Sequence, residues 1–117
     1  MNDIKKLVLA KPIKINGEEY KELPYDLENF TARDKMEAGK KYRNDGGMIS
    51  VQELDSDYHL YLFAQSVAKV EKSIDITDIL RLNAKDATKA GNIVRSFFFI
   101  DSEENQENTQ MKSSEEQ

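Results

Sequence analysis

The stretch that decides the fold is DSDYHLYLFAQSVAKVEK, which runs from Asp55 to Lys72. Asp55 or Ser56 can cap a helix at its start, because a short polar side chain satisfies free backbone N–H groups of the first turn. Helical spacing predicts an inward stripe made of Leu60, Tyr61, Ala64, Val67 and Ala68. Four further apolar residues surround the rest of the helix: Tyr58, Leu62, Phe63 and Val70. A helix that is apolar on most sides is either buried centrally or covered by a partner on its second face.

Before this helix, the segment LVLAKPIKINGEEYKELPYD, residues 7–26, predicts a β-hairpin. Asn16-Gly17 is the turn, since both central positions of a type I′ turn need positive φ. The register that follows pairs Ile15 with Glu18 and Ile13 with Tyr20, with Leu9 on the same face. Pro12 lacks a backbone donor, so we expect either that its strand lies at an edge or that its missing donor points outward. We expect Pro24 to end the second strand.

A helix over about 32–43 is expected next, because Thr31 with Asp34 three residues later matches a capping box. The run Asn44–Gly47 is a helix-ending turn. We expect the inward stripe of this helix to hold Ala32, Met36, Gly39 and Tyr42 or Arg43. A basic cluster near its end, Lys40, Lys41 and Arg43, complements the helix dipole. The next segment, MISVQEL at residues 48–54, is compatible with either a short strand or a helical turn.

After the central helix, SIDITDILRLNAKDATKAGNIVRSFFFI predicts a short helix and a longer one. The short helix starts at Asp75 or Thr77 and ends near Leu82. Asn83 caps the longer helix, which runs to about Phe98. The inward stripe of the longer helix holds Ala87, Ala90, Val94 and Phe97, widened by Ile93.

The tetrapeptide Phe97–Ile100 is more apolar than one helical turn can bury, since four consecutive residues point in different directions. We expect one or two of the phenylalanine rings to pack into the core. The rest is expected to be exposed, and an exposed aromatic patch marks an interaction site.

Charge divides the chain at Ile100. Six of its 22 acids but only one of its 17 bases follow this residue, so the net charge of −5 belongs to residues 101–117. That segment has one methionine as its only apolar residue, and we expect a disordered acidic tail. Residues 1–100 are expected to form a single α+β domain, an N-terminal β-hairpin packed on a small bundle of three to four helices.

Several functional classes are disfavoured by composition. A neutral body lacks the basic face that nucleic-acid binding or electrostatic membrane docking requires. The absence of cysteine excludes disulfides and a Cys-built zinc site. No apolar stretch is long enough for a signal-peptide core or a membrane span, so we expect an intracellular, soluble protein.

His59 is the only histidine, and on a helix it lies one turn from Asp55. Two ligands without a third group make a weak metal site, so we interpret Asp55 as a cap. No serine has the sequence context of a catalytic triad, and the glycines match no phosphate loop. We therefore expect no metal, no cofactor and no enzymatic activity.

Four segments together resemble the tail assembly chaperones of long-tailed phages and prophages. These are LAKPIKINGEEYKEL, LENFTARDKMEAGKKY, YHLYLFAQSVAKV and ILRLNAKDATKAGNIVRSFFF. The resemblance covers about residues 7–100, and the L-x-A-K-D-A and V-x-x-F-F patterns at 82–87 and 94–98 carry most of it. It implies a small, non-catalytic factor of the host cytoplasm that is absent from the mature virion.

The resemblance also implies partners. Such chaperones bind the tape measure protein, keep it soluble and help tail tube subunits to polymerise around it, the latter through a longer frameshifted form. Self-association stays open. No motif fixes the binding residues, so we choose the second face of the central helix and the end of the last helix: Tyr58, Leu62, Phe63, Phe98, Phe99 and Ile100. The alternative function is a regulatory, antirepressor-like adaptor that binds one folded partner.

Overall fold

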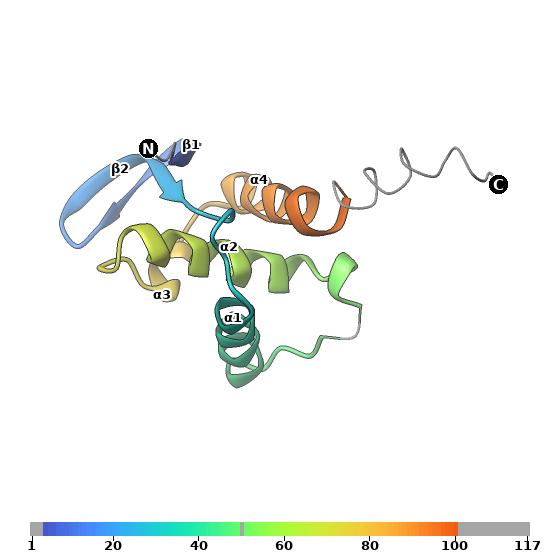
Figure 1. Ribbon diagram of the computed structural model, residues 1–117. Coiled ribbons are helices and arrows are strands. Elements are labelled where there is room, and N and C mark those ends of the chain that lie inside the picture. Colours follow the sequence, from blue (N-terminus) through green and yellow to red (C-terminus); the bar gives the residue numbers. More distant parts are fainter. Residues whose placement is uncertain (1–3, 50, 101–117) are drawn as a thin grey trace, which may run out of the picture.

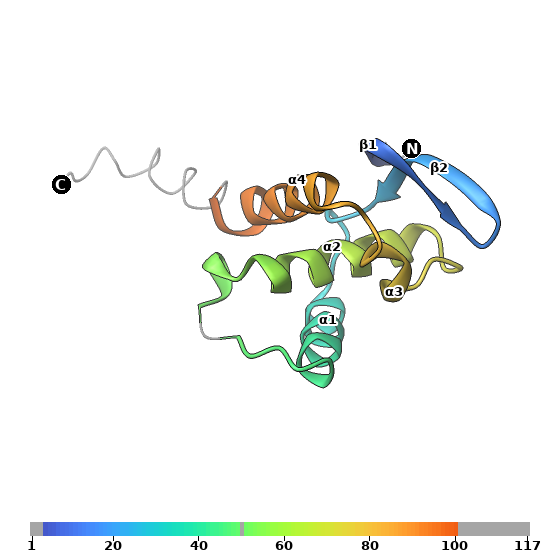
Figure 2. The ribbon, with the colours of Figure 1, turned by 180° about the vertical axis from the view of Figure 1, so that it is seen from behind.

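The computed structural model describes residues 4–49 and 51–100, without the side chain of Ile100. It has the expected α+β fold, an N-terminal two-stranded antiparallel hairpin followed by helices. Helix α2 (Ser56–Val70) crosses the middle of the molecule, with α4 (Ala84–Arg95) on one side and α1 (Ala32–Asn44) on the other (Figures 1 and 2). The hairpin lies against one end of α2 and α4, and the chain leaves at the opposite end.

The hairpin consists of β1 (Lys5–Ile15) and β2 (Glu18–Tyr25). Asn16 and Gly17 have φ angles of 53° and 82°, which confirms the predicted turn with two positive φ angles. The predicted pairs Ile13–Tyr20 and Ile15–Glu18 are also present. The expected end of β2 is wrong by one residue, because Pro24 still pairs with Lys6 before the strand ends.

The register of the hairpin shifts between Val8 and Ile13, so β1 has extra residues there. Leu7, Leu9, Ile13 and Ile15 lie at alternate positions of β1 and are all buried. The register shift brings Leu23 of β2, which is also buried, opposite Leu7. Pro12 lies in the irregular stretch, outside the paired positions, as its missing donor requires.

Asp86 of α4 holds this irregular stretch of β1. Its Oδ1 and Oδ2 accept hydrogen bonds from the backbone N–H groups of Ala10 and Lys11, at 2.7 and 3.0 Å. Lys89 lies 3.3 Å from the same carboxylate and donates to the carbonyl of Val8. The outer edge of β1 is therefore bound by side chains from α4, and the hairpin is joined to the helices by polar as well as apolar contacts.

The helix caps agree with the sequence. Thr31 and Asp34 form the predicted capping box of α1, and Asp55 and Asn83 cap α2 and α4. Asp75 caps α3 (Ile76–Ile79), which is shorter than expected because it ends before Leu82. A 3₁₀ turn, η1 (Gln52–Leu54), occupies the segment for which strand and helical turn were open.

The inward face of α1 differs from the predicted stripe. Ala38 and Gly39 are buried, whereas the side chain of Met36 is 70% exposed. Gly39 belongs to the predicted stripe, and a Cβ added there would meet the Tyr58 ring at an ordinary contact distance of 3.8 Å. The prediction is therefore right for Gly39 and wrong for Met36.

The core surrounds α2, which contacts α1, β2, α3 and α4. Of the two alternatives for a helix that is apolar all round, central burial is the one observed. The fully buried side chains come from every layer and include Ile15, Leu23, Leu62, Phe63, Ile79 and Val94.

Candidate functional site

The second face of α2 is core, which corrects half of the predicted binding surface. Tyr58 is 3% exposed, and Leu62 and Phe63 are fully buried. The ring of Phe63 lies 5.3 Å from that of Tyr25 of β2, tilted by 48°, and Tyr58 lies against Tyr42 of α1. The hairpin and α1 cover the surface that was expected to await a partner.

The three phenylalanines of the aromatic tetrapeptide are only partly covered. The α-helical part of α4 ends at Arg95, earlier than predicted, and a π-helical turn, η2 (Ser96–Ile100), follows. A wider turn changes the directions of successive side chains relative to an α-helix. Phe97, Phe98 and Phe99 are each half-buried. Phe97 and Phe98 pack against the core, which confirms the expectation that one or two of the rings contribute to it, whereas none of the three rings is fully exposed.

Each ring of η2 has a different neighbour. Phe98 lies 5.7 Å from Phe30, and Phe97 meets Phe98 edge-on at 5.0 Å. Phe99 lies 5.3 Å from the ring of His59. The predicted site residue Ile100 belongs to the same turn, but its side chain lies outside the described residues.

His59 is a structural residue in this arrangement. It is 2% exposed, and its Nε2 lies 2.6 Å from the carbonyl oxygen of Gln52. Burial lowers the pKa of His59, so the neutral ring donates this hydrogen bond at neutral pH. Asp55 accepts from the backbone N–H of Tyr58, as expected for a cap. Within residues 4–49 and 51–100, no three potential metal ligands lie together.

The loop between α1 and α2 adds exposed apolar side chains that the sequence reading missed. Met48 is 86% exposed, Leu54 69% and Val51 47%. The only signal in the sequence was MISVQEL itself, an apolar segment that fitted neither a strand nor a helix well. The backbone of η1 reaches the end of α4, where Arg95 donates to the carbonyl of Glu53 at 3.0 Å.

Two tyrosines fix the ends of this loop. Tyr42 donates to the carboxylate of Asp55, and Tyr61 donates to that of Asp45. Burial, together with the hydrogen bond to Asp45, raises the pKa of Tyr61 to about 12, so it remains a donor. The loop is anchored at both caps while its middle presents apolar side chains outward.

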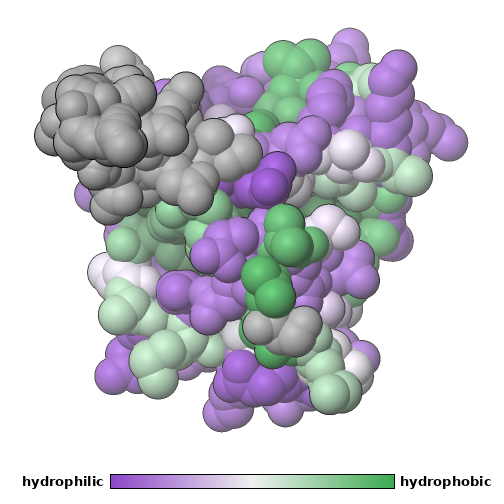
Figure 3. All heavy atoms as spheres, turned by 90° about the vertical axis from the view of Figure 1, so that its right-hand side faces the viewer, coloured by the Kyte–Doolittle hydropathy of each residue, from purple (hydrophilic) through white to green (hydrophobic). Residues whose placement is uncertain are grey.

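The loop and η2 form one end of the molecule, which we call the apolar end: Met48, Val51, Leu54, Phe97, Phe98 and Phe99. Figure 3 looks onto this end, where apolar residues lie among polar ones. Exposed apolar side chains gathered at one place mark a surface for another macromolecule more often than scattered ones do.

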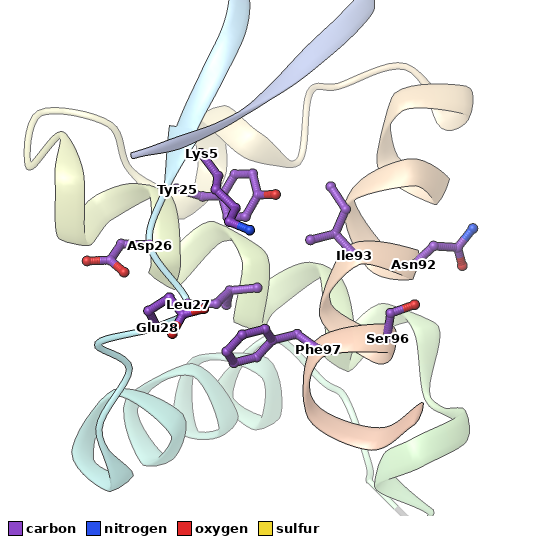
Figure 4. A pocket seen from close by; sticks show the side chains of 9 residues that line it. All are labelled: Lys5, Tyr25, Asp26, Leu27, Glu28, Asn92, Ile93, Ser96 and Phe97. Carbon is purple, nitrogen blue, oxygen red and sulfur yellow. The ribbon is translucent and has the colours of Figure 1, made fainter. Parts of the chain in front are cut away.

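A groove of about 510 Å³ continues the apolar end between the hairpin and α4. Tyr25 and Leu27 form one wall, and Ile93 and Phe97 project from the other (Figure 4). Lys5 and Glu28 lie at its rim, whereas Asp26 and Asn92 point away. The sequence placed Ile93 and Phe97 on one stripe but gave no sign that the end of β2 would face them.

Comparisons of the chain with protein-family models, with curated proteins and with solved structures found no match. Within the ranges that the structure describes, none of the helices has the length and apolar character needed to cross a bilayer.

Proposed function

We propose that this protein is a non-catalytic tail assembly chaperone that holds an apolar helical segment of the tape measure protein. The observation that carries the proposal is the apolar end, with Leu54 and Met48 more than two-thirds exposed at 69% and 86%. A protein that only needed to fold would gain little from presenting these side chains to water.

The groove beside the apolar end suits a helical client. An amphipathic helix binds by placing residues three or four positions apart into an apolar groove. One client side chain would enter between Leu27 and Phe97, and the next turn would lie on Phe98 or Phe99. Lys5 and Glu28 at the rim can pair with charges of either sign, so the groove would select apolar anchors rather than client charge.

The wider role rests on the sequence resemblance. In this proposal the chaperone works in the host cytoplasm, keeps the long client soluble through many weak contacts, and is absent from the virion. Tail tube protein would be recruited by a frameshifted longer form. The adaptor alternative predicts instead one folded partner at a fixed ratio.

The test begins with the DNA on both sides of the gene. We expect a slippery heptamer near the 3′ end and, further on, a very long gene for a helix-rich protein. That client is then produced with this protein, and the fraction of client that stays in solution is measured. Leu54→Asp is expected to weaken client binding about tenfold, because it places an unpaired carboxylate in an apolar contact and a tenfold change corresponds to only about 1.4 kcal/mol.

Val8→Asp is the matched control, because Val8 is 64% exposed but lies on the hairpin. It introduces the same charge at a similar exposure, and client binding should be unchanged. Equal binding by both variants would overturn the assignment of the apolar end. A gene neighbourhood without tail genes, or a complex with one folded protein, would overturn the chaperone proposal.

A further inference from the structure

A second groove, separate from the apolar end, lies along α1 and is lined with cations. It has a volume of about 480 Å³, and its basic lining residues are Arg33, Lys35, Lys40 and Arg43. In the described part of the chain none of these four forms an ion pair. Among the described lining residues, Glu37 is the one acid. The nearby Asp34 does not line the groove and is paired with Lys69 at 2.8 Å.

The floor of this groove is partly apolar. Met36 is 70% exposed, and Ile49 and the buried ring of Tyr58 lie beside it. A groove with cations at its rim and a methionine on its floor suits an acidic peptide that carries an apolar side chain. A simple anion would leave the floor uncovered.

The chain itself contains such a peptide. Residues 101–117 carry six acids and one base, and Met111 is their only apolar residue. Residues 1–100 are neutral overall, but cations outnumber acids in the lining of the α1 groove. The excess of acids after Ile100 is opposite in charge to this lining.

The end of η2 lies close to the groove. The Phe99 ring is 5.3 Å from His59, whose Nε2 is 2.6 Å from the carbonyl of Gln52, and Gln52 lines the groove. A helix of 13 residues such as α1 is about 20 Å long. An extended chain covers about 3.3 Å per residue, so Met111 can reach any part of the groove from Ile100.

We propose that the α1 groove is a docking site for the chain's own acidic segment, residues 101–117, with Met111 against Met36 and Ile49. Each exposed ion pair is weak. The tether compensates, because it holds the segment at an effective concentration in the millimolar range. The docked segment covers the apolar floor and neutralises the cations, and salt releases it because exposed charges are screened.

The test uses the full chain, which contains no cysteine, so Gln110→Cys provides a single site for a nitroxide label. Amide signals of the isotopically labelled protein are compared with the nitroxide oxidised and reduced. We expect the α1 amides near Met36 and Lys40 to lose most of their intensity and the hairpin amides to keep theirs. Raising the salt from about 20 mM to about 0.5 M should restore the α1 signals, because the Debye length falls.

A charge-reversed groove, Lys35→Glu with Lys40→Glu and Arg43→Glu, should abolish the effect. The matched control reverses three exposed hairpin cations, Lys11, Lys14 and Lys21, and should leave the effect intact. Folding of both variants is checked by circular dichroism, and the salt titration of the unmutated groove remains decisive if one unfolds.

Three results would overturn the proposal. The first is an unchanged α1 spectrum, and the second is broadening spread evenly over the surface. The third is broadening of unlabelled chains by nitroxide-bearing chains in a mixed sample, which would place the acidic segment on a second copy. No client is present in these experiments, so their failure would leave the proposed chaperone function untouched.

Discussion

At the scale of single residues, His59 shows how burial can use a titratable group for structure alone. Its ring is enclosed by Phe99 and by the backbone of Gln52, and burial lowers its pKa. The sequence placed this histidine beside Asp55 and gave two interpretations, a weak metal pair and a capped helix. The cap could be predicted because its rules are local, whereas the contact with Gln52 needs the loop to fold back over α2.

We predict that His59 makes stability fall as the pH drops below the unfolded pKa of about 6.5. An unfolded histidine titrates near 6.5. Because the folded pKa is lower, the unfolded chain binds more protons, so the free energy of unfolding falls as the pH falls below about 6.5. Urea unfolding at several pH values measures this slope. His59→Gln should remove the slope and leave client binding intact, and a loss of binding by the folded variant would contradict a purely structural role.

At the scale of elements, the beginnings of the helices and most inward faces could be predicted, whereas the ends of α3 and α4 could not. Capping residues and the Asn16-Gly17 turn specify where elements begin, because their hydrogen bonds are local. The face of α1 was predicted only in part, since Gly39 is buried as expected but Met36 is exposed. The same holds for η2, where the change from an α-helix to a π turn redirects three phenylalanines that an unbroken helix would place differently.

The turn η2 provides a prediction that separates folding from binding. Phe97 contacts the core and lines the groove, so Phe97→Ala should lower the free energy of unfolding by about 2 kcal/mol, less than the ~3–5 kcal/mol of a fully buried phenylalanine. Phe99→Asp should cost less stability than Phe97→Ala, because Phe97 packs on the core, and it should weaken client binding. Thermal unfolding and binding are measured for both variants, and equal loss of stability would assign both rings to the core.

At the scale of the whole molecule, the α+β class followed from composition and pattern, whereas the central burial of α2 was one of two alternatives that the sequence left open. The candidate site was predicted less accurately from the sequence. Three of its six predicted residues, Tyr58, Leu62 and Phe63, are core, because a sequence cannot show which neighbours will cover a helix that is apolar on all sides. The exposed loop residues Met48 and Leu54 were missed for the converse reason, since an apolar side chain in a segment without clear periodicity gives no sign of facing water.

Asp86 joins the hairpin to α4 by hydrogen bonds between residues that are far apart in the sequence. Burial raises the pKa of Asp86, but the hydrogen bonds from Ala10 and Lys11 and the charge of Lys89 outweigh this and lower it. The ionised carboxylate joins the first strand to the last helix across 76 positions of sequence, from Ala10 to Asp86. The hairpin and the helices should therefore unfold together.

We predict that Asp86→Asn lowers the free energy of unfolding at pH 7 by about 2–3 kcal/mol, because a buried charged acceptor is lost. Since the folded pKa lies below the unfolded value of about 3.9, the stability that Asp86 provides is present above pH 4 and is lost as the pH falls through the folded pKa. Urea unfolding between pH 7 and pH 2.5 should show a smaller acid-dependent loss in the variant. Asp57→Asn, at an exposed position of α2, is the matched control and should behave as the unmutated protein.

Hydrogen exchange of the Lys11 amide gives a second measurement. In Asp86→Asn this amide should exchange faster than the amides of α4, whereas equal rates would mean that apolar contacts alone hold the hairpin.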